Sequence, residues 1–142
     1  MAEFVMKDLV EKAHLKEHFH IESAAVSSEE LGNPVYPPAR SILAEHGLAC
    51  AGKRAELMTE RDYQRFDLIV CMDDSNIRRA KRILNGDPEE KLVLLMNFTD
   101  RPGNVSDPWY TGDFSAAWRD ISKGCRALLD RLLQDGVGTT RD

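Results

Sequence analysis

The sequence predicts a single α/β domain built as a three-layer sandwich, with helices on both faces of a small parallel sheet. Two segments, 67–72 and 91–96, are nearly continuous apolar runs, which is typical of strands buried on both faces. Helical patterns precede, separate and follow these runs, and strands that alternate with helices favour parallel pairing. With 142 residues, the chain is long enough to form one core without disulfides.

The N-terminal half begins on a helical pattern. Residues 1–13 place apolar side chains on one broad stripe, which predicts an amphipathic helix. Residues 19–25 alternate in polarity and predict a short strand. After a polar loop, two consecutive prolines open a helix that runs to about His46, and Gly47 follows where a C-terminal cap belongs.

The C-terminal half continues the alternation of helix and strand. A threonine begins a short helix over 59–65. Asp74 or Ser75 caps the helix that connects the two buried strands, and a Gly-Asp-Pro sequence ends it. The last helix is predicted over 113–133, where apolar residues recur at helical spacing.

The predicted domain therefore spans 1–133, and the Gly- and Thr-rich residues 134–142 form a flexible tail. Three strands are visible in this pattern. A parallel α/β sheet normally opens on a strand, whereas this chain opens on a helix. We therefore expect the first strand of the sheet to be absent.

Composition limits the classes of partner. A net charge of −5 argues against nucleic acid, and no apolar run approaches the ~20 residues of a membrane helix. The three cysteines, Cys50, Cys71 and Cys125, are odd in number and widely spaced, so we expect reduced thiols and a cytoplasmic protein. We expect no cofactor.

Two clusters of charged or metal-binding side chains have simpler explanations. His14 and His18 are four residues apart, but no carboxylate or thiol completes a set with His20, so we expect no metal. The basic residues between 78 and 82 lie on a predicted helix, where a solvated face explains them better than a nucleic-acid site.

Five segments together resemble the low-molecular-weight protein tyrosine phosphatase family. They occur in the family's order and cover nearly the whole chain. They are Met1–Phe4, Ser23–Ala25 with Gly32–Pro34, His46–Leu48, Asp67–Asp73 with Asn76, and the Asp-Pro-Trp-Tyr run from Asp107 to Tyr110.

The resemblance also implies a loop that these residues do not supply. Family enzymes carry Cys-x5-Arg between the first strand and the first helix, where the cysteine is the nucleophile and the arginine with backbone amides holds the phosphate. That loop would precede Met1. Cys71 and Arg78 have six residues between them. Cys50 and Arg54 have three, and Cys125 is followed at once by Arg126 in a predicted helix. We therefore expect a chain without the nucleophile loop, inactive by itself.

Asp107 is the candidate catalytic residue. In the family this aspartate protonates the leaving oxygen, a role typically worth ~10²–10⁴ in rate. By its spacing alone, Asp-Pro is better explained as the start of a turn, and the Asp-Pro-Trp-Tyr run within the family pattern reverses that preference. The resemblance makes Trp109 and Tyr110 walls for a phosphotyrosine ring, and places Glu29 where many members have an aromatic residue beside the site.

The resemblance leaves three functional hypotheses. The first is a phosphatase acting on phosphotyrosine proteins or aryl phosphates that lacks its nucleophile loop here. The second is a non-catalytic binding or self-assembling module, since a missing central strand would leave a slot that a second copy could fill to form a homo-oligomer. The third, an arsenate reductase, fits less well because it needs redox cysteines near the site.

Overall fold

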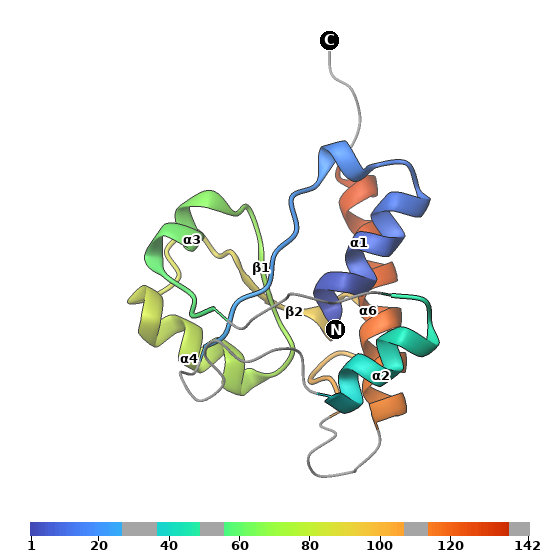
Figure 1. Cartoon of the computed structure of the whole chain (residues 1–142). Helices are drawn as coiled ribbons and strands as arrows, with labels where there is room; N and C mark the ends of the chain where they lie inside the picture. The colour runs from blue at the N-terminus through green and yellow to red at the C-terminus, as the bar shows by residue number, and fades with distance from the viewer. Residues whose placement is uncertain (27–36, 49–55, 107–113, 137–142) are drawn as a thin grey trace.

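The computed structural model describes residues 1–26, 37–48, 56–106 and 114–136. These residues form two parallel strands with helices on both sides, so the predicted α/β layering is confirmed (Figure 1). The strands are β1 (Ile69–Cys71) and β2 (Leu92–Leu94). On one side lie α1 (Ala2–Lys12), α2 (Pro37–Glu45) and α6 (Phe114–Gln134), and on the other α3 (Glu60–Arg65) and α4 (Asp74–Leu84).

The two strands pair in parallel register from Ile69 with Leu92 to Cys71 with Leu94. A parallel pair needs a crossover connection, and α4 supplies it. Both strands consist largely of branched apolar residues, which suit a pleated surface that packs on both faces. Their carboxyl ends consequently open toward the same edge of the sheet.

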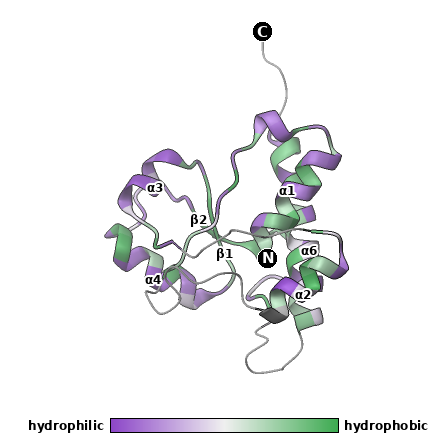
Figure 2. Ribbon diagram, in the orientation of Figure 1, coloured by the Kyte–Doolittle hydropathy of each residue, from purple (hydrophilic) through white to green (hydrophobic). Residues whose placement is uncertain are grey.

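The core is divided by the sheet into two clusters. The first joins α1 and α6 around the 3₁₀ turn η3 (Leu95–Phe98), and the second joins α3 and α4 to the strands. Figure 2 shows hydrophobic residues on the strands at the centre and on α1, α2 and α6, while α3 is mostly hydrophilic. Burial on both faces of so short a sheet explains why its strands contain almost no polar residues.

The predicted strand over 19–25 is wrong for most of its length. Within the described residues, only Ala25 makes a bridge, accepting from Met58 N at 2.8 Å and donating to Glu56 O at 2.7 Å. Phe19 and Ile21 instead pack on the α1–α6 cluster. The alternation in polarity reflects an extended segment lying on a core, because a strand also requires a neighbouring backbone to pair with.

Two element boundaries also differ from the prediction. The cap of α4 is Asp73, one residue before the predicted candidates, and its Oδ1 accepts from Asn76 N at 2.7 Å. The second apolar run leaves the sheet after Leu94, and its last residues enter η3. Leu95 and Met96 are fully buried in that turn, so their apolar character indicated burial rather than strand.

The helices agree well with the sequence pattern. Thr59 begins α3, with its backbone N donating to Asp62 Oδ2 at 2.9 Å. Gly47 adopts a positive φ of 75° just after α2, as a C-terminal cap does. The last helix, α6, ends at Gln134, and 137–142 of the predicted tail lie outside the described residues. Among the described helices, none combines the length and apolar character needed to cross a bilayer.

Candidate functional site

The turn after β1 is fixed by two reciprocal side-chain bonds. Asp73 caps α4 through Asn76 N, and Asn76 Oδ1 in return accepts from Met72 N at 3.0 Å. These bonds hold the backbone at the point where β1 ends, which is where ligands commonly bind in parallel α/β sheets. The segment is the one that the sequence singled out as Asp67–Asp73 with Asn76.

The loop after η3 crosses this carboxyl edge. Val105 N donates to Met72 O at 2.9 Å, and Asp74 N donates to Asn104 Oδ1 at 3.1 Å. A third bond, from Gly103 N to Asn97 Oδ1 at 3.2 Å, stabilises the loop internally. Residues 104 and 105 are thus held directly against the turn that follows β1.

A buried carboxylate on α6 holds the end of this loop. Asp120 is only 8% exposed, and its Oδ2 accepts from the backbone N of Ser106 at 2.8 Å and from its Oγ at 2.7 Å. Its other oxygen, Oδ1, accepts from the guanidinium of Arg101. Burying a carboxylate is costly unless it is paired and hydrogen-bonded, and Asp120 is both.

Sequence reasoning missed Asp120, although the sequence carries a signal for it. Ala117, Ile121 and Gly124 flank it at helical spacing and are all buried. An aspartate within such an apolar stripe has to find partners from another segment. Its position therefore indicated a polar contact with a loop that packs on α6.

The start of α1 reaches the same region. Met1 and Ala2 pack on the same core cluster as Met72 and Val105, and Cys125 Sγ donates to Ala2 O across 3.8 Å. Glu3 is 6% exposed and links two of the segments that the resemblance rests on. Its carboxylate accepts from Ser23 Oγ and from Lys7 Nζ, both at 2.6 Å.

The predicted site residues themselves lie outside the described residues. These are Asp107, Trp109, Tyr110 and Glu29, together with Cys50. The structure therefore neither brings them together nor separates them. Ser106 immediately precedes the undescribed residues 107–113, which include Asp107, Trp109 and Tyr110, and it belongs to the carboxyl edge just described.

The two described thiols are unsuited to nucleophilic attack. Cys71 is 4% exposed in β1, and burial, reinforced by Asp73 and Asp87, raises its pKa to about 11. Cys125 is 2% exposed in α6, and burial raises its pKa to about 12. Because the thiolate is the reactive form, both cysteines are inert near neutral pH.

One Cys-x5-Arg spacing does occur in the chain, from Cys125 to Arg131, and sequence reasoning overlooked it. Both residues lie within α6, where six residues correspond to about 9 Å of rise and a different helix face. Cys125 is buried, whereas the Arg131 side chain is 63% exposed and pairs with Asp135 at 3.5 Å. A continuous helix cannot direct its amides at an anion as a loop does, so this match has no catalytic meaning.

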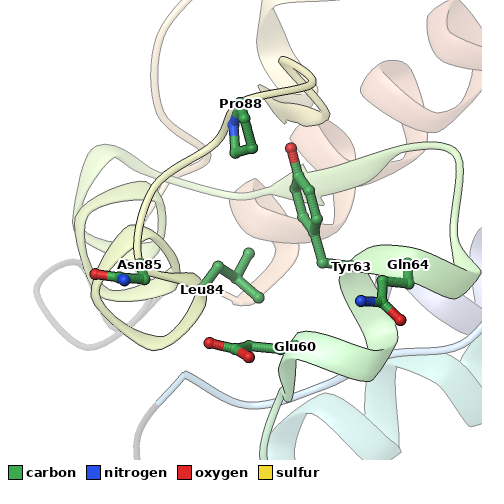
Figure 3. Close-up of a pocket in the computed structure, with 6 residues that line it drawn as sticks. All are labelled: Glu60, Tyr63, Gln64, Leu84, Asn85 and Pro88. Atoms are coloured by element: carbon green, nitrogen blue, oxygen red, sulfur yellow. The ribbon is translucent and has the colours of Figure 1, made fainter.

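A pocket of about 270 Å³ lies near the amino ends of the strands, between α3, α4 and the turn before β2 (Figure 3). Beside it, Tyr63 donates to Asp87 Oδ1 at 2.7 Å, and Asp87 also accepts from Lys91 N at 2.8 Å. Burial by itself would raise the pKa of Asp87, but these bonds and that from Leu92 N outweigh it and lower the pKa. The network anchors the start of β2. The residues around the pocket are Glu60, Tyr63, Gln64, Leu84, Asn85 and Pro88.

Among the described residues, neither the acidic nor the basic clusters form a second functional site. In the part of the chain that the structure describes, no three His, Cys, Asp or Glu side chains are grouped as a metal site requires. Arg78, Arg79, Lys81 and Arg82 are exposed on α4 and make no ion pair with other described residues. This arrangement is consistent with a solvated helix face.

Comparisons with known proteins agree on one family. The model of the low molecular weight phosphotyrosine protein phosphatases matches residues 1–137. Low molecular weight phosphotyrosine protein phosphatase 2 of Drosophila melanogaster is 34% identical over 134 residues, which cover 91% of this chain and 81% of that protein. The human low molecular weight phosphotyrosine protein phosphatase is 32% identical over 136 residues, covering 92% and 85%.

Solved structures show the same similarity in three dimensions. YfkJ from Bacillus subtilis superposes with a TM-score of 0.88 at 28% identity, covering 94% of this chain and 86% of that one. The low molecular weight protein tyrosine phosphatase from Streptococcus pyogenes gives 0.82 at 35% identity, covering 92% and 82%. Since the family model spans nearly the whole sequence and the fold is shared, the chain belongs to the low molecular weight phosphotyrosine protein phosphatase family.

Proposed function

We propose that this phosphatase-family protein recognises phosphotyrosine or aryl phosphate monoesters at the carboxyl edge of its sheet, with Asp107 as general acid. The observation that carries the proposal is the anchoring of Ser106 at this edge by Asp120 and by the neighbouring bond from Val105 to Met72. Asp107 is the next residue in the chain after Ser106, and Val105 packs on the same core cluster as the beginning of α1. A general acid acts only within hydrogen-bond reach of the oxygen that it protonates, so a firmly held neighbour supports this role for Asp107.

The proposed roles of the neighbouring residues follow from their chemistry. Asp107 in its protonated form donates a proton to the aryl oxygen as the phosphoryl group departs. Trp109 and Tyr110 contact the faces or edges of the substrate ring, since aromatic pairs attract in offset or edge-to-face arrangements. Glu29, an acidic residue near the ring, weakens binding of substrates with acidic groups beside the phosphotyrosine.

We propose in addition that the 142-residue polypeptide by itself does not turn over substrate. With a pKa of about 11, Cys71 has only about one thiol in ten thousand ionised at pH 7, and Cys125 has fewer. The helix and strand that carry these thiols also offer no loop of converging amides to a phosphoryl group. Incubation with p-nitrophenyl phosphate should therefore release no product above the buffer rate. Turnover abolished by Cys50→Ser would contradict this proposal.

Substrate recognition can be tested without turnover. Trp118→Phe leaves Trp109 as the only tryptophan, and phenylalanine retains the stacking on His46, whose ring centroid lies 4.0 Å from that of Trp118. A phosphotyrosine peptide should change Trp109 emission, while the matched phosphoserine peptide should not. Tyr110→Ala should weaken the response to phosphotyrosine. Equal responses to the two peptides would rule out recognition of the aryl ring.

We also propose self-association along the second edge of β1. Ile69 N donates to Lys91 O at 2.9 Å, and alternate residues of a parallel strand bond to opposite sides, so Val70 N faces away from β2. Among the described residues, no strand pairs with that edge. Open edges attract further strands, so we expect dimers in sedimentation runs and slower exchange of the Val70 amide as concentration rises. A monomer at all concentrations would contradict the proposal.

We place the protein in the cytoplasm. Both described cysteines are free thiols buried in the core, Cys71 in β1 and Cys125 in α6. A protein whose thiols remain reduced suits a reducing compartment.

A further inference from the structure

We propose that Asp120 is a positioning residue that fixes the segment carrying Asp107. This inference rests on the proposed function, in which Asp107 is the general acid, but it concerns a different residue on a different element. Asp120 lies in the second turn of α6, and its side chain bonds to Ser106 and Arg101 of the loop that leads to residue 107. Its effect is transmitted through Ser106.

The contacts of Asp120 form a three-donor clamp. Ser106 supplies two of the donors, its backbone N and its Oγ, and both donate to Oδ2 of Asp120. The third comes from the guanidinium of Arg101 and points at Oδ1. Arg101 is itself held by the bond from its backbone N to Thr99 Oγ1 at 3.1 Å. The clamp therefore fixes two points of the loop that leads to residue 107.

The position of Asp120 on α6 makes the clamp effective. The segment 107–113 is bounded by Ser106 and by Phe114, the first residue of α6. Asp120 follows Phe114 by about nine ångströms of the same helix. One rigid element therefore holds both ends of the segment: the helix start holds its carboxyl end, and the Asp120 side chain holds its amino end.

The geometry requires a carboxylate rather than an amide. All three donors donate to oxygen atoms of the side chain, and each oxygen of a carboxylate can accept more than one hydrogen bond. Asparagine has one oxygen and one NH₂ group, so in either orientation a donor would face Ser106 or Arg101. Asp120→Asn consequently breaks at least one side of the clamp while changing the volume of the side chain very little.

The test uses Trp109, which lies within the segment, as an internal probe. In the Trp118→Phe background, acrylamide quenching and anisotropy of Trp109 report the motion of the segment. We expect Asp120→Asn to raise the quenching constant about twofold and to lower the anisotropy, as local opening does. The measurements are made where far-ultraviolet circular dichroism and thermal melting show both proteins fully folded.

The matched control is Asp130→Asn. Asp130 lies on the same helix, is exposed, and makes no hydrogen bond or ion pair with the other residues that the structure describes, so the same chemical change removes no such contact. It should leave both signals of Trp109 unchanged, and Asp120→Glu, which keeps the carboxylate, should restore part of the parental anisotropy. An Asp120→Asn protein that is folded and shows parental quenching and anisotropy would overturn the proposal.

The two proposals fail in different ways. The Trp109 signal requires no substrate and no turnover, so it tests the clamp alone. If the clamp responds as expected but phosphotyrosine peptides do not bind, the proposed function fails and the positioning of the segment by Asp120 stands. If the peptides bind and the Trp109 signals do not change in Asp120→Asn, the positioning role of Asp120 fails and the proposed function stands.

Discussion

At the scale of single residues, packing between η3 and α6 depends on one glycine. A Cβ atom at Gly124 would lie 2.5 Å from Leu95 Cγ, well inside contact distance. Leu95 is 1% exposed and cannot swing away, because the α1–α6 cluster surrounds it. A helix normally disfavours glycine by roughly 1 kcal/mol relative to alanine, so its presence here reflects the close approach.

Gly124→Ala should therefore destabilise the protein despite its better helix propensity. Overpacking a core typically costs about 1–3 kcal/mol, which exceeds the propensity gain, and we expect a net loss of about 1 kcal/mol in urea unfolding. Leu95→Ala in the same chain should remove the penalty of the added methyl group. A Gly124→Ala protein that is more stable than the parent would show that η3 can move away from α6 without a loss of stability.

Ser122→Ala provides a matched control two residues away on the same helix. Within the described residues, the buried Ser122 Oγ has no hydrogen-bond partner. Replacing it with alanine removes a desolvated hydroxyl and improves helix propensity, so we expect stabilisation of about 0.5–2 kcal/mol. The two alanine substitutions should thus shift the unfolding midpoint in opposite directions.

At the scale of elements, local signals predicted most of the helices. Thr59 with Asp62 and Gly47 after α2 act where the sequence indicated, because caps depend on neighbouring residues alone. The segment 19–25 was mispredicted because pairing depends on a distant backbone. The role of Asp120 depends likewise on a loop that meets α6 only in the folded chain.

The N-terminus of α4 is the element boundary closest to the candidate site, and it depends on one cap. Asp73→Ala removes the acceptor for Asn76 N and should cost about 0.5–2 kcal/mol in urea unfolding. Asp74→Ala is the control, because this neighbour is exposed and its loss affects only the interaction with the helix dipole, worth about 0.3–1 kcal/mol. Equal losses would mean that Asp73 contributes only its charge.

At the scale of the whole molecule, the site is distributed over segments that are remote in sequence. The start of α1, the turn after β1 and the loop ending at Ser106 meet on the core cluster that α6 completes. The motif order could be recognised from the sequence alone, since each motif is short. The convergence of Glu3 with Ser23 and of Asp120 with Ser106 could not, because the pattern around a buried charge shows that it needs a partner but not which distant segment supplies one.

The free energy of unfolding should fall as the pH rises above about 9, because the buried thiols resist ionisation in the folded protein. Burial raises the pKa of Cys71 to about 11 and of Cys125 to about 12 from an ordinary value of 9.0. A raised folded pKa means that the stabilisation is fully present below pH 9 and is lost as pH rises through the folded pKa, because the unfolded thiol ionises first. Burial, with Asp87 beside it, also raises the pKa of Tyr63, which adds to the same trend.

Cysteine substitution separates the thiols from the other groups. Each pH unit between the unfolded and folded pKa is worth about 1.4 kcal/mol per thiol, so from pH 8 to 10.5 one buried thiol accounts for at most about 2 kcal/mol. In urea unfolding under reducing conditions, Cys125→Ala should lose correspondingly less stability over this range than the parent protein, although it starts lower because of its cavity. Parallel pH profiles for the two proteins would mean that Cys125 ionises in the folded state as readily as in the unfolded chain, and that water reaches the interface between α1 and α6.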